Sequence, residues 1–359
     1  MKKLNVGVVG ATGMVGQRFL TILENHPWFN LKILAASSKS ANKKYEDAIK
    51  NRWKLEENPP EKFKDLIVLD AQKDMEKIAK EVDFIFCAVN MDKKETLKLE
   101  EEYAKLECPV ISNNSAARNL ADVPMIIPEI NSNHAKIIDV QKKRLKTKKG
   151  FIAVKSNCSI QSYVPAISPL LKYSPTKILA CTYQAISGAG KTFNEWEEMK
   201  DNVIPFISGE EEKSELEPLK IWGEIKNNQI VLNNNISITT QCLRVPVSDG
   251  HMAAVFVSFK EKPTIEQIKT NWENYETDIK NLNLPSAPKK FIHYFNQPQR
   301  PQPKLDKNLE NGMAISIGRL REDSQFNYKF VCLSHNTLRG AAKGAVLMAE
   351  LLTKLGYLN

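Results

Sequence analysis

A cysteine near the middle of the chain stands where a nucleophile could work. Cys158 lies in the segment 155–161, Lys-Ser-Asn-Cys-Ser-Ile-Gln, between an apolar run at 151–154 that indicates a strand and helix-compatible sequence at 161–171. Unpaired backbone N–H groups and the helix dipole favour a thiolate at a helix N-terminus. The segment therefore predicts a nucleophilic cysteine. The alternative is a buried structural thiol, because free cysteine is among the most buried residue types.

Aldehyde or acyl chemistry on a cysteine also needs an acid/base group, a group that polarises the carbonyl and a hydride carrier. The segment 242–251, Cys-Leu-Arg-Val-Pro-Val-Ser-Asp-Gly-His, offers Arg244 and His251. Histidine exchanges protons near neutrality, and arginine binds a carboxylate with two parallel hydrogen bonds. We expect this strand end and its Pro/Gly loop to project both side chains towards Cys158. The alternatives are a hydrogen-bonded loop histidine and a surface ion pair.

A glycine-rich turn near the N-terminus predicts the hydride carrier. The valine-rich run 3–9 indicates a buried parallel strand, the turn 10–16 reads Gly-Ala-Thr-Gly-Met-Val-Gly, and 17–24 is an amphipathic helix. Strand, glycine turn and helix form the context of a dinucleotide fingerprint, although the spacing is GxxGxxG and not GxGxxG. The alternative is an ordinary tight turn.

The next strand predicts which dinucleotide binds. The strand 31–36 ends in Ser37, Ser38 and Lys39, where NAD sites usually carry an acidic residue for the ribose hydroxyl. Hydroxyls and an ammonium suit a 2′-phosphate instead, which predicts NADP. The alternative is a polar loop without a ligand.

The order of strands and helices predicts two kinds of sheet. Strand and helix patterns alternate up to about residue 115, which indicates a Rossmann-like, doubly wound parallel sheet. We expect 126–131 to be an edge segment closed by proline and 134–143 to be a helix. Beyond Cys158 the pattern indicates an α+β domain with a mostly antiparallel sheet, from strands at 178–185, 236–244, 252–260, 313–318 and 326–333. The Ala-rich segment 336–355 is predicted to be a helix that returns to the first domain.

Composition excludes several classes of protein. The chain has 359 residues, of which 42% are hydrophobic and 26% charged, as in globular proteins of two domains. No apolar run is long enough to span a bilayer, and no cleavable leader precedes the first strand, so we expect a cytoplasmic protein. The six cysteines show no metal-type spacing and should be reduced.

The net charge of +9 could indicate nucleic-acid binding. The lysines, however, are mixed with glutamates, apart from one cluster at 142–149 that we interpret as a solvated helix end. No nucleic-acid-binding motif accompanies them. A basic protein also suits a phosphorylated substrate and cofactor.

Several segments together resemble the aspartate-β-semialdehyde dehydrogenase family in its archaeal and fungal type. They are GATGMVG, AASSKS, SNNSAAR, SNCSIQ, YQAISGAG, GEEEK, RVPVSDGH and HNTLRGAAKGA, spread from residue 10 to residue 345. The resemblance implies an NADP-binding domain at 1–156 and 337–359 and a catalytic and dimerisation domain at 157–336. Asn114 and Ile160 depart from the residues that are commoner in the family.

The resemblance also implies a role for each matching residue. Cys158 would be the nucleophile, His251 the acid/base and Gln184 a group that positions the thioester and water. Substrate would be bound through its carboxylate by Arg244, through its ammonium by Glu210, and through its phosphate by Lys213, Arg118 and Asn157. Glu210 is preferred over its two neighbouring glutamates because it shares a helix face with Lys213. NADP would be bound by Gly10, Thr12, Gly13, Met14, Val15, Ser37, Ser38 and Lys39, with Ser187, Gly188 and Asn336 near the nicotinamide. No metal is implied.

The implied reaction is the reversible, NADPH-dependent reductive dephosphorylation of L-aspartyl 4-phosphate to L-aspartate 4-semialdehyde through a cysteine thioester. It belongs to the route to lysine, diaminopimelate, threonine, methionine and isoleucine, and the family commonly forms homodimers or homotetramers. One alternative is a malonyl- or succinyl-CoA reductase, which would need neither Glu210 nor Lys213. N-acetyl-glutamyl-phosphate reductase, whose acylated amine needs no glutamate, and a non-catalytic NADP-binding protein are two more.

Overall fold

The first apolar run of the chain forms β1 (Leu4–Val9) at the centre of a six-stranded parallel sheet. The computed structural model describes residues 2–358. The strand order is β3-β2-β1-β4-β5-β6, with β2 (Phe29–Ala36), β3 (Val68–Asp70), β4 (Phe84–Cys87), β5 (Val110–Ser112) and β6 (Ile152–Val154). The order reverses beside β1, and ligands bind outside the carboxyl ends of strands at such a switch point. The predicted parallel sheet is confirmed.

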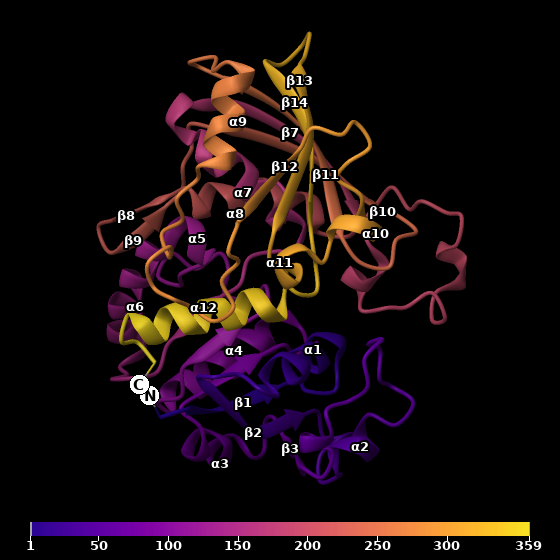
Figure 1. Cartoon of the computed structure of the whole chain (residues 1–359). Coiled ribbons are helices and arrows are strands. Elements are labelled where there is room, and N and C mark those ends of the chain that lie inside the picture. Colours follow the sequence, from indigo (N-terminus) through magenta and orange to yellow (C-terminus); the bar gives the residue numbers. More distant parts are fainter. Residues whose placement is uncertain (1, 359) are drawn as a thin grey trace.

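Helices cover both faces of this sheet (Figure 1). On one face α1 (Met14–Leu23) and the C-terminal helix α12 (Ala342–Lys354) share a core with Val6 and Val8 of β1. The other face carries α3 (Met75–Glu81) and α4 (Lys93–Lys105). Because α12 follows the last strand of the second sheet, it brings the end of the chain back to the first lobe, as predicted. In Figure 1 it lies across the waist between the lobes.

The second lobe is built on a mixed sheet of order β10-β7-β11-β14-β13-β12. Its strands are β7 (Pro175–Gln184), β10 (Ser237–Arg244), β11 (His251–Phe259), β12 (Ile292–Phe295), β13 (Ile315–Glu322) and β14 (Tyr328–Ser334). The β10–β7 and β12–β13 pairs are parallel and the other three are antiparallel. One face packs against α7 (Val164–Ile167), α8 (Glu210–Ile221) and α9 (Ile265–Glu273). The opposite face of β7 and β11 stays partly exposed.

Two predicted elements differ because of proline. The segment 126–131 is not an edge strand: Met125 makes a single bridge to Val154, and Pro128 then begins the helix α5 (Pro128–Asn131), since proline fits the first turn of a helix. The predicted helix at 161–171 is broken into η3 (Ser159–Gln161), α7 and η4 (Ser168–Tyr173), with prolines in the first turns of the last two. A proline removes a backbone donor, so a continuous helix does not form.

Short elements complete the chain. They are α2 (Tyr45–Ala48), η1 (Glu61–Phe63), η2 (Ser132–Ile137), α6 (Ile138–Leu145), η5 (Ile186–Ala189), η6 (Glu197–Met199), β8 (Glu224–Lys226), β9 (Gln229–Val231), α10 (Pro303–Asp306) and α11 (Leu309–Gly312).

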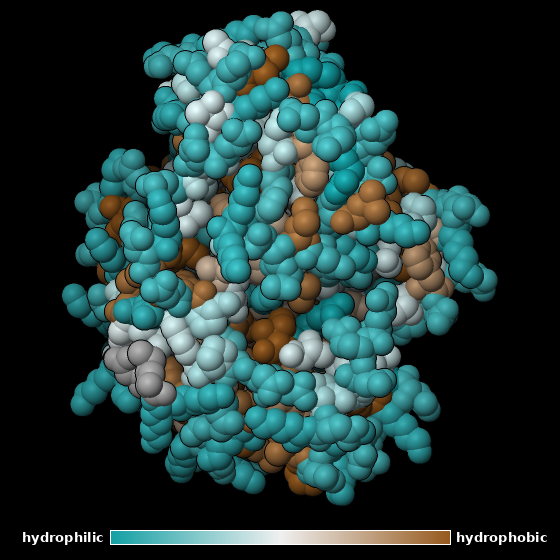
Figure 2. All heavy atoms as spheres, in the orientation of Figure 1, coloured by the Kyte–Doolittle hydropathy of each residue, from teal (hydrophilic) through white to brown (hydrophobic). Residues whose placement is uncertain are grey.

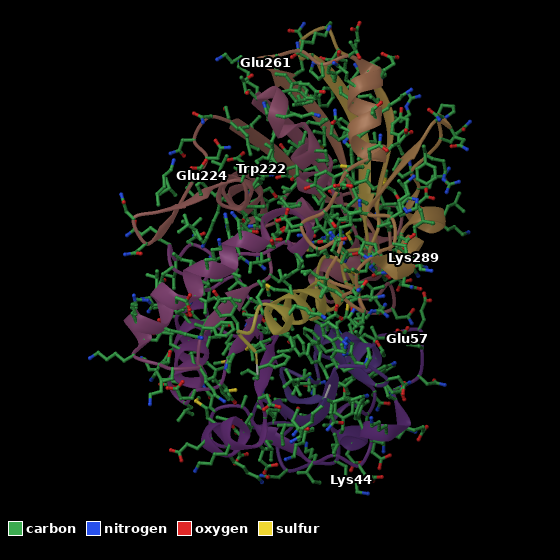
Figure 3. All side chains as sticks on the ribbon, turned by 60° about the vertical axis from the view of Figure 1, so that its left-hand side comes forward. Lys44, Glu57, Trp222, Glu224, Glu261 and Lys289 are labelled. Carbon is green, nitrogen blue, oxygen red and sulfur yellow. The ribbon has the colours of Figure 1, made fainter. Side chains whose placement is uncertain are left out.

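On the face seen in Figure 2 hydrophilic residues predominate, and hydrophobic ones gather in small separate groups. In Figure 3, Lys44 and Glu261 lie at opposite ends of the molecule. Across residues 2–358, no helix has the length and apolar character needed to cross a membrane. Nor do the described residues bring together three side chains able to hold a metal ion.

Candidate active site

The predicted nucleophile and the predicted imidazole meet where the two lobes join. Cys158 follows β6, the edge strand of the first sheet, and His251 is the first residue of β11 in the second. The Cys158 Sγ lies 3.4 Å from His251 Nε2. On the other side of the ring, the backbone N–H of Ala185 donates to His251 Nδ1 at 3.0 Å. The imidazole is fully buried, whereas the cysteine is half-buried.

Burial disfavours charge on both members of this pair. The pKa of the Cys158 thiol is raised to about 11, chiefly by burial and also by Glu210, while Arg118, Arg244 and Lys155 oppose the rise. Burial also holds the pKa of His251 well below its usual value, and Arg244 and His335 lower it further. This raised pKa runs against the thiolate predicted at a helix N-terminus. The helix after Cys158 is a single turn of three residues, and burial is the largest cause of the shift.

The helix α8 supplies the acidic side chain of the site. Glu210 begins this helix and is almost buried. Its carboxylate accepts hydrogen bonds from Lys213 Nζ at 2.8 Å, from Asn157 Nδ2 at 3.0 Å and from Gln184 Nε2 at 3.3 Å. Burial opposes ionisation of Glu210, but Lys213, Asn157 and Gln184 outweigh it and lower its pKa. The structure thus brings Glu210, Lys213, Asn157 and Gln184 into one cluster.

The two neighbouring glutamates lie elsewhere. The Glu211 carboxylate accepts from Gln241 Nε2 at 2.8 Å, and Glu212 is exposed. The structure therefore distinguishes Glu210 from both, on the helix face that Lys213 shares.

Arg118 is held by a residue that the sequence did not single out. Its Nη1 donates to Glu217 Oε1 at 2.8 Å and its Nη2 donates to the Asn113 carbonyl at 3.0 Å. The other oxygen of Glu217 accepts the backbone N–H of Asn157 at 2.6 Å. Glu217 therefore connects Arg118 to the nucleophile loop. Its signal is the spacing from Glu210, since residues seven apart share a face of a helix.

Arg244 lies beside the imidazole. Its Nη1 donates to the carbonyl of Ala185 at 2.6 Å, and the side chain is buried. A Cβ at position 188 would lie 2.8 Å from Arg244 Nη1 and 2.9 Å from the His251 ring. A side chain at position 188 would therefore have to displace Arg244 or His251, and glycine lets the chain approach both groups this closely.

The glycine turn forms one wall of a cleft between the lobes. Gly10 has a φ of +93°, and a Cβ there would collide with the carbonyl of Ala88. The cleft holds about 890 Å³, and its lining includes Thr12, Gly13, Met14, Val15, Asn113 and Gly188. The Asn113 carboxamide is buried and makes no hydrogen bond within the described part of the chain. An open backbone, a helix N-terminus and a free carboxamide fit a dinucleotide.

The residues predicted to bind the 2′-phosphate of the cofactor lie outside the cleft. Ser37, Ser38 and Lys39 follow β2 and are exposed, and they are not among the residues that line the cleft. Arg52 Nη1 reaches Ser40 Oγ at 3.4 Å, which adds a second cation near this loop. The sequence offered no signal for Arg52, because the contact depends on the fold.

The predicted nicotinamide end is a closed hydrogen-bond network. Asn336 Nδ2 donates to Ser187 Oγ at 2.8 Å, and Asn336 Oδ1 accepts the Gly250 N–H at 2.8 Å. Ser187 Oγ donates in turn to Asp249 Oδ1 at 2.8 Å. Asp249 is a second residue that the sequence did not reveal, although it stands two positions before His251.

Comparison with known proteins agrees with this arrangement. Residues 5–138 match the family described as "Semialdehyde dehydrogenase, NAD binding domain", and residues 167–339 match "Semialdehyde dehydrogenase, dimerisation domain". The chain belongs to the semialdehyde dehydrogenase family. Aspartate-semialdehyde dehydrogenase of Saccharomyces cerevisiae is 41% identical to it, over 96% of both chains. The enzyme of Archaeoglobus fulgidus is 40% identical, over 98% of both.

A solved relative shows the same architecture. The crystal structure of aspartate semialdehyde dehydrogenase with NADP from Candida albicans superposes with a TM-score of 0.88 at 36% identity, covering 99% of this chain and 100% of that one. The resemblance to archaeal and fungal semialdehyde dehydrogenases is thereby confirmed. Cys158 lies between the two matched segments. The predicted domain boundaries at 156/157 and 336/337 stay predictions, as do the roles of individual site residues.

Proposed function

We propose that this semialdehyde dehydrogenase interconverts L-aspartyl 4-phosphate and L-aspartate 4-semialdehyde with NADP. One observation carries the proposal: Cys158 Sγ lies 3.4 Å from His251 Nε2, and a buried carboxylate, Glu210, and a buried guanidinium, Arg244, are near enough to shift the pKa of the thiol. A group that attracts an ammonium and a group that attracts a carboxylate suit the two ends of an α-amino acid. The relatives named above carry the same activity in their names.

The chemistry divides among a few residues of the chain. Cys158 attacks the acyl carbon and holds the aspartyl group as a thioester, while Arg244 and Glu210 fix its carboxylate and ammonium. The Lys213 ammonium lies 2.8 Å from the Glu210 carboxylate. Lys213 therefore lies beside the position proposed for the substrate ammonium, and its own ammonium would bind the phosphate. Gln184, hydrogen-bonded to Glu210, orients the acyl group and water.

Phosphate would bind between two lobes. Arg118 comes from the first and Lys213 from the second, with the Asn157 amide between them. Arg118 Nε is buried without a hydrogen-bond partner among the described residues, so it is a free donor for an anion. Two cations and an amide suit a doubly charged group.

The cofactor would be held along the cleft at the carboxyl ends of the first sheet. Gly10, Thr12, Gly13, Met14 and Val15 would contact the pyrophosphate, and Ser37, Ser38 and Lys39, joined by Arg52, the 2′-phosphate. Ser187, Gly188 and Asn336 would meet the nicotinamide. When bound, NADP supplies or accepts the hydride. The segment 37–40 contains no acidic side chain that would repel a 2′-phosphate.

The alternative, a malonyl- or succinyl-CoA reductase, is not favoured. Such a substrate lacks an ammonium and a phosphate on its acyl group, and it would leave Glu210 and Lys213 without a function. The named relatives are aspartate-semialdehyde dehydrogenases over nearly their full length.

We propose further that two copies pair through the second sheet. Its outer face presents half-exposed or exposed apolar residues, among them Leu179, Tyr183, Met252 and Phe256. A partly exposed apolar face of this kind suits a homodimer interface, from which a tetramer could assemble. A cytoplasmic location is part of the same proposal, because all six cysteines are free thiols, as is usual in a reducing compartment.

A pair of assays tests the function. Purified enzyme is given aspartate semialdehyde and NADP⁺, with phosphate in one reaction and coenzyme A in the other. We expect NADPH to form only with phosphate and to be lost in Cys158→Ala. Turnover with coenzyme A alone, or full turnover by Cys158→Ala, would contradict the proposal.

A further inference from the structure

A buried lysine near the end of α8 holds the backbone around Arg118. Lys220 is only 4% exposed, and its Nζ donates to the carbonyl of Arg118 at 2.6 Å and to that of Leu120 at 2.7 Å. Both carbonyls belong to the segment 113–124, which runs in turns between β5 and α5. Buried carbonyls outside regular structure need hydrogen-bond partners from elsewhere in the chain. The Lys220 side chain is such a partner.

We propose that Lys220 is a positioning residue for phosphate: its charged form holds the segment around Arg118 where the guanidinium can bind the anion. This inference rests on the proposed function, which places phosphate at Arg118. Lys220 donates to backbone carbonyls and not to the substrate, so it acts through Arg118.

One face of α8 holds Arg118 at both ends. Glu217 Oε1 accepts from the Arg118 guanidinium at 2.8 Å, while Lys220 binds the backbone of the same residue. Glu217 and Lys220 are three positions apart and therefore share a helix face. Arg118 belongs to the first lobe and α8 to the second, so both contacts cross the junction of the lobes. Loosening of the backbone would move the guanidinium, and with it the buried Nε that is proposed to donate to the phosphate.

The strength of this hold depends on the charge of Lys220. Hydrogen bonds from an ammonium are roughly twice as strong as those from a neutral amine. Burial lowers the pKa of Lys220 to about 8, while the carboxylates of Asp122 and Glu217 oppose the shift. Lys220 is therefore mostly charged below about pH 7 and mostly neutral above about pH 9.

Titratable groups face Lys220 from each element that packs around it. They are Asp122 with its partner Arg144, Glu217 with its partner Arg118, and His134 of η2. Each carboxylate is thus already paired with an arginine. The pKa of His134 is lowered, chiefly by burial and also by Lys220, so this imidazole brings no second cation at neutral pH. These pairings explain why burial prevails and Lys220 loses its proton in mildly alkaline solution.

The first test is the KM for phosphate in the oxidation of aspartate semialdehyde by NADP⁺, measured from about pH 7 to pH 9. We expect Lys220→Met, which has neither a charge nor a donor, to raise this KM about tenfold near pH 7. The ratio of variant to wild type should fall to about threefold near pH 9, because the wild-type amine has then lost its charge. The ionisation of phosphate affects both proteins equally and cancels in the ratio. KM for NADP⁺ should not change.

Lys226→Met, at an exposed lysine of β8, is the matched control and should follow the wild type at every pH. Lys220→Arg keeps its charge throughout, so its KM relative to the wild type should fall about threefold over the same range, and it serves if Lys220→Met does not fold. A ratio independent of pH, or a KM for NADP⁺ that rises with the KM for phosphate, would overturn the proposal. Absence of phosphate-dependent turnover in the wild type itself would overturn the proposed function, and the role of Lys220 with it.

The second test needs no substrate, so its outcome is independent of the proposed function. It is NMR of the ligand-free enzyme with ¹³C-labelled lysine. Exposed lysines should titrate near about pH 10.4, whereas Lys220 should titrate near pH 8. Lys155→Met removes the other lysine whose pKa is lowered into this range, so the early signal that remains belongs to Lys220. If no lysine of Lys155→Met titrated below about pH 9.5, the proposal would be overturned.

Discussion

The most unusual buried group outside the reacting pair is the amine of Lys155. Only 2% of this residue is exposed, and Nζ has no hydrogen-bond partner among the described residues. Its stem lies against α12, because a Cβ on Gly344 would collide with Lys155 Cε. Its pKa is lowered to about 7, chiefly by burial, with contributions from the cations Arg339 and Arg118. We predict that Lys155→Met, a change of similar volume without a charge, stabilises the protein.

The size and the sign follow from linkage. A free lysine has a pKa of about 10.4, so the folded state binds its proton more weakly by roughly three units, or about 4 kcal/mol. Below about pH 7 the wild type bears this penalty in full. Above it the folded state has released the proton while the unfolded state still holds it, so stability rises with pH by about 1.4 kcal/mol per unit until about pH 10. Lys155→Met should lack this rise.

The assay is urea unfolding of both proteins at one fixed concentration, between about pH 7 and pH 9.5. We expect the variant to be more stable by roughly 4 kcal/mol near pH 7 and the advantage to shrink by about 1.4 kcal/mol per pH unit. Lys136→Met, at an exposed lysine of η2, is the matched control and should keep the wild-type slope. A variant that is less stable at pH 7, or an advantage independent of pH, would refute the reasoning.

Three further predictions concern the site. Glu217→Gln should raise KM for phosphate about tenfold, because Arg118 loses a charged partner. Glu212→Gln, on the exposed face of the same helix, should leave this KM unchanged. Equal effects of the two substitutions would contradict the account. Gly10→Ala should abolish NADPH binding, measured by fluorescence titration, because the residue needs a φ of +93° and its Cβ would meet the Ala88 carbonyl; unchanged affinity would disprove this. Lys54→Ala should weaken NADPH binding up to about fivefold, because Lys54 Nζ donates to the Gly190 carbonyl at 2.7 Å across the cleft; tighter binding would contradict it.

The features that the sequence predicted well depend on local chemistry. The first sheet follows from alternating strand and helix patterns. The turn at position 10 has a positive φ, a backbone conformation that favours glycine. The return of α12 to the first lobe could also be predicted, because its apolar faces need a core to cover them. The contact between Glu210 and Lys213 could be predicted from helical spacing, and the two side chains lie 2.8 Å apart, while the role of Glu210 towards the substrate stays a prediction.

The features that the sequence did not predict depend on contacts between distant segments. Glu217 gains its place only when α8 packs beside the nucleophile loop, and Arg52 only when its loop folds beside Ser40. The raised pKa of the Cys158 thiol was not predicted, because its largest cause is burial, which cannot be seen in a motif. The partner of His251 Nδ1 is a backbone amide, which no residue type reveals.

The central claim is that Cys158 carries the aspartyl group as a thioester during the reaction. It is tested most directly by mixing enzyme with aspartyl phosphate in the absence of NADPH, quenching in acid and mapping the adduct by peptide mass spectrometry. The account predicts one aspartyl group on the peptide that contains Cys158, none in Cys158→Ala, and loss of the adduct when NADPH is added before the quench. An aspartyl group on another residue, or turnover with no adduct on Cys158, would contradict it.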